Sequence, residues 1–192
     1  MPHSPNLEVE IKLPVSDLIA TKEHITQLGW RPLTPRTFEI NILLDLADSS
    51  LRNQGVVLRL RQYGDRAVLT YKGPGQDAKH KVREEFETSV GDLQTLQVIL
   101  GHLGYHPTFR YEKYRTEFTD NTGHLTLDET PIGNFLELEG PPDWIDNQAA
   151  RLGYSESDYI TLSYGRLYAA YCRRANVPIT HMVFDNPSTA KE

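Results

Sequence analysis

The sequence LEVEIKL, at residues 7–13, alternates apolar and charged side chains without a break. Successive side chains of a β-strand point to opposite faces, so this period of two predicts a strand with one charged and one apolar face. The charged face carries Glu8, Glu10 and Lys12, and the apolar face carries Val9, Ile11 and Leu13. Two carboxylates at this spacing repel each other unless positive charge lies near them. Lys12 supplies part of that charge, and a divalent cation would supply more.

The same alternation recurs in later segments, and the signs of the charges are sorted by segment. We expect strands at about Thr37–Asp45, Val56–Tyr63, Ala67–Lys72, His80–Val90, Thr108–Thr119, His124–Glu129 and Asn134–Glu139. Basic residues form the pairs Arg59/Arg61 and Lys113/Arg115, whereas Glu137 and Glu139 form an acidic pair like Glu8 and Glu10. A single strand of this kind is usually a solvated sheet face, on which the signs are mixed. Sorted signs over several strands instead indicate a charged cavity.

A polyphosphate with a bound metal ion would offer a partner of opposite charge to both the acidic and the basic pairs. Carboxylate pairs suit a hard divalent cation such as Mg²⁺ or Mn²⁺, which takes oxygen ligands. Arginine pairs suit phosphate oxygens, which a guanidinium engages through two parallel hydrogen bonds. The strand at His80–Val90 carries both signs on one face, through Lys81, Arg83, Glu85 and Glu87. On two further strands, Lys72 shares a face with Thr70, and Asp128 shares a face with Thr126.

Apolar residues at helical spacing predict helices between and after the strands. The first follows Ser16, which we expect to be its N-cap, and closes at Gly29. Others are expected at residues 93–103, Asp143–Leu152 and about Leu162–Arg174. Pro32 and Pro35 predict a linker before the second strand. Residues 1–176 are then one domain, and residues 177–192 a C-terminal tail in which residues 182–184 are the candidates for docking.

A weak internal repeat supports this assignment. Leu28-Gly29-Trp30 and Leu103-Gly104-Tyr105 each close an expected helix, and each is followed by a proline two residues later. Each helix follows a charged alternating strand and precedes further strands. Two similar halves forming one antiparallel sheet would give this order, either as a two-layer α+β domain or as a closed barrel.

Composition indicates which partners and which cellular compartment to expect. The chain has 192 residues, a formal net charge of −6 and one cysteine, Cys172. The negative charge argues against a nucleic-acid backbone as partner, and a single cysteine forms no internal disulfide and suits a reducing compartment. Because neither a leader at residues 1–6 nor a long apolar run is evident, we expect a cytoplasmic protein with no membrane contact.

The ordered motifs resemble the CYTH superfamily, also known as the triphosphate tunnel metalloenzymes. Residues 8–12 resemble its ExExK signature, and residues 58–61 (LRLR), 69–74 (LTYKGP), 83–87 (REEFE) and 135–139 (FLELE) resemble later family motifs in the same order. Ser163-Tyr164 resembles the closing motif of the bacterial branch that holds class IV adenylate cyclases. The resemblance covers about residues 5–175 and implies an eight-stranded antiparallel β-tunnel with helices packed on the outside.

The resemblance also implies roles for individual residues. The phosphates would be held by Arg59, Arg61, Lys72, Arg83, Lys113 and Arg115. The metal would be held by Glu8, Glu10, Asp128, Glu137 and Glu139. Glu85, Glu87 and Tyr164 would support these groups. Lys12, Glu10 and Glu137 would be the catalytic set, with Lys12 positioning the attacking water or helping to deprotonate it.

Family members hydrolyse inorganic triphosphate, thiamine triphosphate or nucleoside triphosphates, or cyclise ATP. We therefore expect a triphosphatase dependent on Mg²⁺ or Mn²⁺, acting on a small-molecule triphosphate. The alternatives are a class IV adenylate cyclase and a module that binds polyphosphate or nucleotide without turnover. Residues 41–45 carry leucines where many members have aromatics, so the organic half of the substrate stays open. A monomer or a homodimer fits equally.

Overall fold

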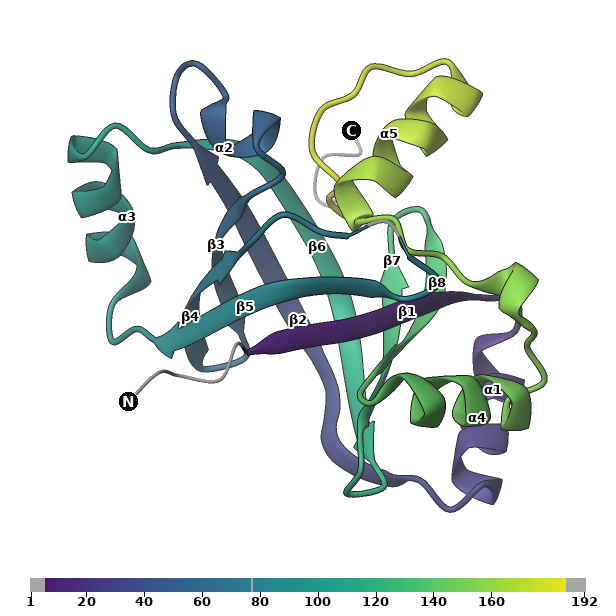
Figure 1. Ribbon diagram of the computed structural model, residues 1–192. Helices are drawn as coiled ribbons and strands as arrows, with labels where there is room; N and C mark the ends of the chain where they lie inside the picture. Colours follow the sequence, from purple (N-terminus) through teal and green to yellow (C-terminus); the bar gives the residue numbers. More distant parts are fainter. Residues whose placement is uncertain (1–5, 77, 186–192) are drawn as a thin grey trace, which may run out of the picture.

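The computed structural model describes residues 6–76 and 78–185. Its strands close into one antiparallel barrel in the order β1-β5-β4-β3-β2-β6-β7-β8 (Figure 1). Their bounds are β1 Leu7–Val15, β2 Arg31–Asp45, β3 Val57–Tyr63, β4 Arg66–Lys72, β5 Lys81–Ser89, β6 His106–Thr119, β7 His124–Thr130 and β8 Gly133–Glu139. This confirms the expected α+β class with an eight-stranded antiparallel tunnel, and decides between the two architectures that the sequence left open.

The helices lie outside the barrel. They are α1 Leu18–Gln27, α2 Ser50–Asn53, α3 Leu93–His102, α4 Pro142–Arg151 and α5 Tyr164–Ala175, with a short 3₁₀ helix at Glu156–Asp158. In Figure 1, α1 and α4 lie together at the lower right, α3 lies on the opposite side, and α5 lies at the upper end, near β7 and β8. None of the residues of α3 is buried. No helix in the described ranges has the length and apolar character needed to cross a bilayer.

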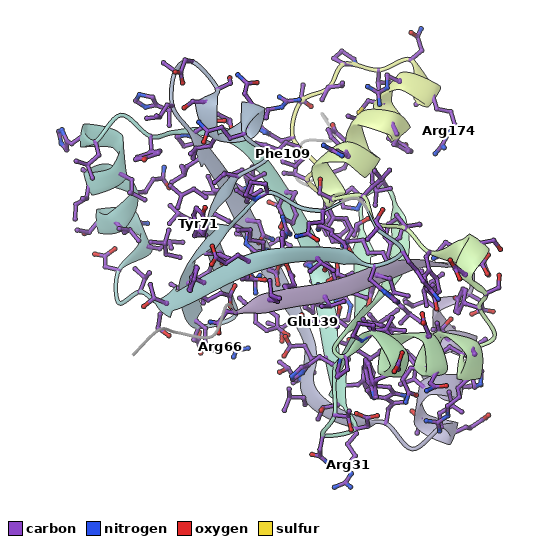
Figure 2. The ribbon with its side chains drawn as sticks, in the orientation of Figure 1. Arg31, Arg66, Tyr71, Phe109, Glu139 and Arg174 are labelled. Carbon is purple, nitrogen blue, oxygen red and sulfur yellow. The ribbon has the colours of Figure 1, made fainter. Side chains whose placement is uncertain are left out.

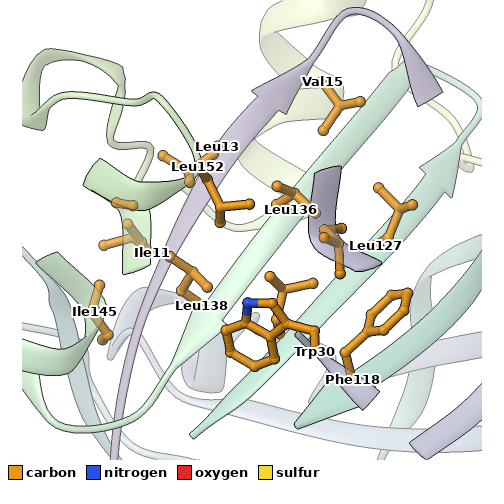
Figure 3. Close-up of a cluster of buried hydrophobic side chains, with 13 residues drawn as sticks. Ile11, Leu13, Val15, Trp30, Phe118, Leu127, Leu136, Leu138, Ile145 and Leu152 are labelled. Atoms are coloured by element: carbon orange, nitrogen blue, oxygen red, sulfur yellow. The ribbon is translucent and has the colours of Figure 1, made fainter. Parts of the chain in front are cut away.

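The apolar face of the strands points outward, toward the helices. Ile11, Leu136 and Leu138 are fully buried in a cluster that also takes Ile145 from α4 and Trp30, which directly precedes β2 (Figure 3). Burial of such side chains typically contributes about 1.5–3 kcal/mol each. Because side chains alternate along a strand, packing this face against α1 and α4 turns Glu8, Glu10 and Lys12 into the barrel. The usual arrangement, in which the charged face of a sheet contacts water, is reversed here.

Two boundaries differ from the sequence-based expectation. The N-cap of α1 is Asp17, not Ser16: its carboxylate accepts hydrogen bonds from the Ile19 and Ala20 amides at 3.0 Å. The expected linker after α1 is instead the first part of β2, which begins at Arg31. Its prolines are tolerated because the β2–β6 pairing shifts register around them, between Pro32 and Thr34 and between Thr34 and Thr37.

The first part of the expected tail is docked on the barrel. Met182 is fully buried and pairs with Tyr111 of β6 in a parallel bridge. Phe184 follows it and packs against Tyr114, with ring centroids 5.3 Å apart. Residues 182–184 therefore dock, as the apolar character of the segment suggested. Residues 186–192, and the expectation for residues 1–5, lie outside the described ranges.

Candidate active site in the barrel

The inner wall of the barrel brings the predicted basic residues together. Arg59 donates hydrogen bonds to Tyr111 (3.2 Å), Thr70 (3.3 Å) and Glu87 (3.2 Å). Arg61, two residues along β3, lies 3.5 Å from the same Glu87. These contacts place Glu87 as the group that orients both arginines, in line with the supporting role implied by the resemblance.

A second basic group lies beside the first, on β4 and β5, where β5 pairs with β1. Lys72 donates to Glu8 and to Glu85, both at 2.7 Å, and Arg83 donates to Glu8 at 2.9 Å. The register of the strands explains the contact, because Glu8 pairs with Arg83 and Lys72 pairs with Glu85. Glu85 supports Lys72 in this arrangement, whereas Glu8 serves two cations at once.

Asp128 forms the centre of a third group and is fully buried. It accepts hydrogen bonds from Lys113 (2.8 Å), from both Nε and Nη2 of Arg115 (2.7 Å each) and from the Tyr164 hydroxyl (2.7 Å). Both carboxylate oxygens are engaged by these partners in this structure, and the metal-ligand role that the resemblance implies for Asp128 stays a prediction. Its place in the structure is that of an anchor for Lys113 and Arg115. Tyr164 adds its ring face, over which the Lys113 ammonium lies at 4.9 Å.

Lys12 lies between Glu10 (3.3 Å) and Glu137 (3.1 Å) and is almost completely buried. Burial alone would lower the pKa of Lys12, but the charges of Glu10 and Glu137 outweigh it and hold the pKa above its usual value. A lysine held protonated is a poor proton acceptor. Its geometry therefore suits a fixed cation that orients its neighbours better than a general base.

The barrel also contains residues that the sequence did not single out as a site. Lys81 contacts Glu10, and burial lowers the pKa of Lys81 to about 8. Glu39 and Asn41 on β2 are fully buried and hydrogen bonded to each other at 2.8 Å. Tyr111 on β6 contacts Arg59. The alternation already placed Lys81 on the charged face with Arg83 but gave it no role, whereas no sequence pattern marked Glu39 and Asn41 of β2.

The pKa values of the acidic residues of β1 and β8 are shifted in different directions. Burial and Glu10 raise the pKa of Glu8, yet Lys72 and Arg83 outweigh them and hold it below its usual value. Glu10 and Glu137 are likewise held well below the usual range, because burial is outweighed by Lys12 and further cations. Glu139 differs: it lies opposite Glu10 in the sheet and has no ion pair with any described residue. Glu139 is exposed at the end of β8, yet partial desolvation of its carboxyl group and the like charges of Glu8 and Glu10 raise its pKa to about 7.

These carboxylates match a divalent cation by chemistry, although they are not gathered into a ligand shell. Within the described ranges, no three His, Cys, Asp or Glu side chains converge tightly enough to hold an ion. Glu10 and Glu137 are turned toward Lys12, and Glu8 is turned toward Lys72. The raised pKa of Glu139 nevertheless marks uncompensated negative charge beside Glu10, and hard cations bind such oxygens. We therefore retain Glu10, Glu137 and Glu139 as the candidate ligands, with Glu8 adjoining.

The raised pKa of Glu139 predicts a pH-dependent effect on stability. Its ordinary value is 4.5, so the contribution is fully present below pH 4.5 and is lost as the pH rises through about 7. Glu139→Gln is expected to unfold at higher urea concentration than the wild type at pH 8, and at nearly the same concentration at pH 4. Urea unfolding at both pH values, without divalent cations, measures this. Equal wild-type and variant midpoints at pH 8 would contradict the prediction, and Glu84→Gln on the outer face of β5 is the control.

Comparison with known proteins places this tunnel in a family. A family model for the CYTH domain matches residues 6–164. A protein of Methanocaldococcus jannaschii, whose name proposes an adenylate cyclase, is 30% identical over 134 residues, covering 69% of this chain and 76% of its own length.

Solved structures share the fold at lower identity. A Vibrio parahaemolyticus protein, proposed to be an adenylate cyclase, superposes with a TM-score of 0.78 at 22% identity, covering 86% of this chain and 99% of its own. A Hippeastrum protein is proposed as an adenylyl cyclase and described as having a dominant triphosphatase activity. It superposes with a TM-score of 0.62 at 16% identity, covering 90% of this chain and 96% of its own. With the family model spanning most of the barrel and the charged inner wall built from the matching motifs, this chain belongs to the CYTH family.

Proposed function

We propose that this protein is a divalent-metal-dependent triphosphatase that hydrolyses a linear triphosphate inside the barrel. The observation that carries the proposal is the pairing of every inward arginine and lysine described above with a carboxylate. Such a wall has little net charge of its own, so it suits a triphosphate that brings a cation with it better than a bare polyanion. Phosphate oxygens of the substrate would become partners of the basic groups, and Glu10, Glu137 and Glu139 would be the residues that hold the cation.

The basic groups then act by position and charge. Arg59, Lys72 and Arg83 approach one side of the substrate, and Arg115, held by Asp128, approaches the other. Fixed cations at these places bind phosphate oxygens and neutralise the charge that develops on the leaving group. Mg²⁺ or Mn²⁺ held by Glu10, Glu137 and Glu139 would neutralise further phosphate charge and lower the pKa of water. Lys12, fixed between Glu10 and Glu137, keeps both carboxylates in place.

ATP cyclisation is the second candidate function, and the names given to the relatives favour it. A cyclase must hold the ribose so that its 3′-hydroxyl faces the α-phosphorus, and pyrophosphate then leaves. The cavity beside Arg59 is lined by Leu43 and Val57 together with Tyr111 and Tyr164. The hydroxyls of both tyrosines are already hydrogen bonded to wall residues, Tyr111 to Arg59 and Tyr164 to Asp128. The Hippeastrum protein, with its dominant triphosphatase activity, supports hydrolysis as the first choice.

Product analysis separates the candidates. Purified protein with Mg²⁺ or Mn²⁺ is offered inorganic triphosphate, thiamine triphosphate and ATP in parallel, and products are separated by anion-exchange chromatography. We expect metal-dependent release of orthophosphate, with inorganic triphosphate as a substrate. Cyclic AMP with pyrophosphate would establish the cyclase instead. Binding of triphosphate without any product would leave a binding module and overturn the proposal.

A further inference from the structure

Helix α3 has apolar side chains on every side, although it lies on the surface of the molecule. Its sequence, LQTLQVILGH at residues 93–102, has no Asp, Glu, Lys or Arg. A surface helix normally has one apolar stripe toward the core and charged side chains opposite, whereas a helix that is apolar all round is normally buried on both sides. None of the residues of α3 is buried. One side of α3 therefore lacks the contact for which its sequence is suited.

The side of α3 that faces away from the barrel carries large apolar side chains. Three leucines at helical spacing are half-buried on the other side: Leu93, Leu96 and Leu100. Val98, Ile99 and Leu103, the last directly after the helix, are 60%, 50% and 65% exposed. Because residues three and four apart lie on the same side of a helix, Ile99 and Leu103 are neighbours, with Val98 beside them.

A second exposed apolar patch lies on the neighbouring strands. Strand β3, which α3 contacts, pairs with β4, and β4 pairs with β5. Tyr71 of β4 lies directly opposite Phe86 of β5 on the outer face, with the ring centroids 6.3 Å apart. These two side chains are 38% and 42% exposed. Figure 2 shows Tyr71 on the side of the barrel toward α3. We call Tyr71, Phe86, Val98, Ile99 and Leu103 the α3–β5 surface.

The chemistry of α3 excludes several partners for this surface. Residues 1–5 (MPHSP) and 186–192 (NPSTAKE) contain one large apolar side chain, Met1, so neither end of the chain supplies a matching apolar segment. A helix that lies on a membrane is typically rich in Lys and Arg on its polar face, and α3 has neither. Recognition of a different, charged protein normally pairs opposite charges, for which α3 offers no group.

A second copy of this chain fits the uncharged character of α3. In a two-fold dimer the same surface meets itself, so a charge near the axis would face its own like charge. The formal net charge of −6 makes two copies repel each other over much of their surface. Along α3 they can approach without facing charges. The exposed Gln94 beside the apolar side chains both donates and accepts hydrogen bonds, so it can pair with the same residue of a second copy.

The size of the α3–β5 surface is sufficient for a dimer. From their exposed fractions, its five side chains present on the order of 400 Å² of surface per copy. With the polar residues around them, two copies reach the roughly 1,000 Å² of total buried surface that a specific interface needs. The apolar side chains would form the centre of the contact, which is the part of a homodimer interface from which charges are normally absent.

We propose that the α3–β5 surface is the interface of a two-fold homodimer, in which α3 of each copy packs against the same surface of the other. The side chains of this surface point outward, so each barrel keeps its own inner wall of basic and acidic residues. The inference is independent of the proposed function, because it concerns the outer face of the barrel alone.

The molar mass in solution tests the dimer. Sedimentation equilibrium of the full chain at micromolar concentration, without metal or phosphate, is expected to give twice the chain mass of 21.9 kDa. Ile99→Glu brings like charges into the contact, so we expect it to raise the dissociation constant of the dimer at least about 100-fold. The matched control is Ile19→Glu on α1, where Ile19 is 71% exposed, and we expect it to stay dimeric. A wild-type mass of one chain, or equal dimerisation of the two variants, would overturn the proposal.

Hydrogen exchange of the wild-type chain locates the contact without any substitution. We expect the amides of residues 93–103 to exchange at least about threefold more slowly at a concentration where the dimer forms than after dilution, with Leu18–Gln27 of α1 unchanged. Protection that does not depend on concentration at residues 93–103 would overturn the proposal. Co-sedimentation of a monomeric chain with anionic vesicles would also overturn it and assign the surface to a lipid bilayer.

Discussion

Glu137→Gln is expected to lower the rate of orthophosphate release from inorganic triphosphate by at least about 10²-fold while triphosphate binding stays measurable. Glu137 lies 3.1 Å from Lys12 and also pairs with Arg115. Glutamine keeps the size of the side chain but removes its negative charge, so it neither neutralises a divalent cation nor holds Lys12. Arg59, Lys72 and Arg83 approach the ligand from the other wall and are unaffected.

Steady-state kinetics and isothermal titration calorimetry with the same ligand separate these effects. The matched control is Glu129→Gln, since Glu129 also pairs with an arginine, Arg36, at 2.9 Å, but on the outer face of β7. We expect the control to retain wild-type turnover. Normal turnover by Glu137→Gln would show that Glu137 has no part in metal binding or catalysis. Loss of binding in step with turnover would assign it to the phosphate wall.

Asp128→Ala is expected to have the largest effect on stability, lowering the free energy of unfolding by about 3–5 kcal/mol. Asp128 is fully buried and is the shared partner of Lys113 and Arg115. Its removal leaves these two buried cations short of negative charge and leaves the Tyr164 hydroxyl without its acceptor. A domain of this kind has about 5–15 kcal/mol of stability in total, so the variant is expected to be marginal but measurable.

Urea unfolding with and without inorganic triphosphate tests the cause of this loss. An anion bound in the barrel supplies Lys113 and Arg115 with new partners, so the ligand should raise the unfolding midpoint of the variant. Asp128→Asn, which retains the shape and one acceptor oxygen, should fall between the variant and the wild type. The exposed turn residue Asp65 provides the control, with Asp65→Ala within about 0.5 kcal/mol of the wild type. A loss below 1 kcal/mol for Asp128→Ala would show that Asp128 is not the anchor of this group.

The outer and inner faces of the strands were predictable, but the partners inside the barrel were not. Alternation assigns Arg59, Lys72 and Glu137 to charged faces, because side-chain direction depends only on the period of two. That Lys72 meets Glu8, 64 residues earlier in the chain, follows from the pairing of β1 with β5 and of β5 with β4. Asp128 shows the same limit: its residue type suits a metal, and only its contacts with Lys113, Arg115 and Tyr164 identify it as an anchor.

The sequence by itself determined the strands, their charged faces and the family motifs, since these depend on local periodicity and residue type. The charged interior was expected from the sorted signs and the family motifs, but a period of two by itself leaves open which face is buried. Packing of Ile11, Leu136 and Leu138 against the outer helices decided that. The tertiary structure also decided that the prolines of β2 lie within a strand, at shifts in its register with β6. It likewise decided that Glu39 and Asn41 are buried. The cavity beside Arg59 arises only in the tertiary structure, because it joins the start of α5 to side chains of distant strands.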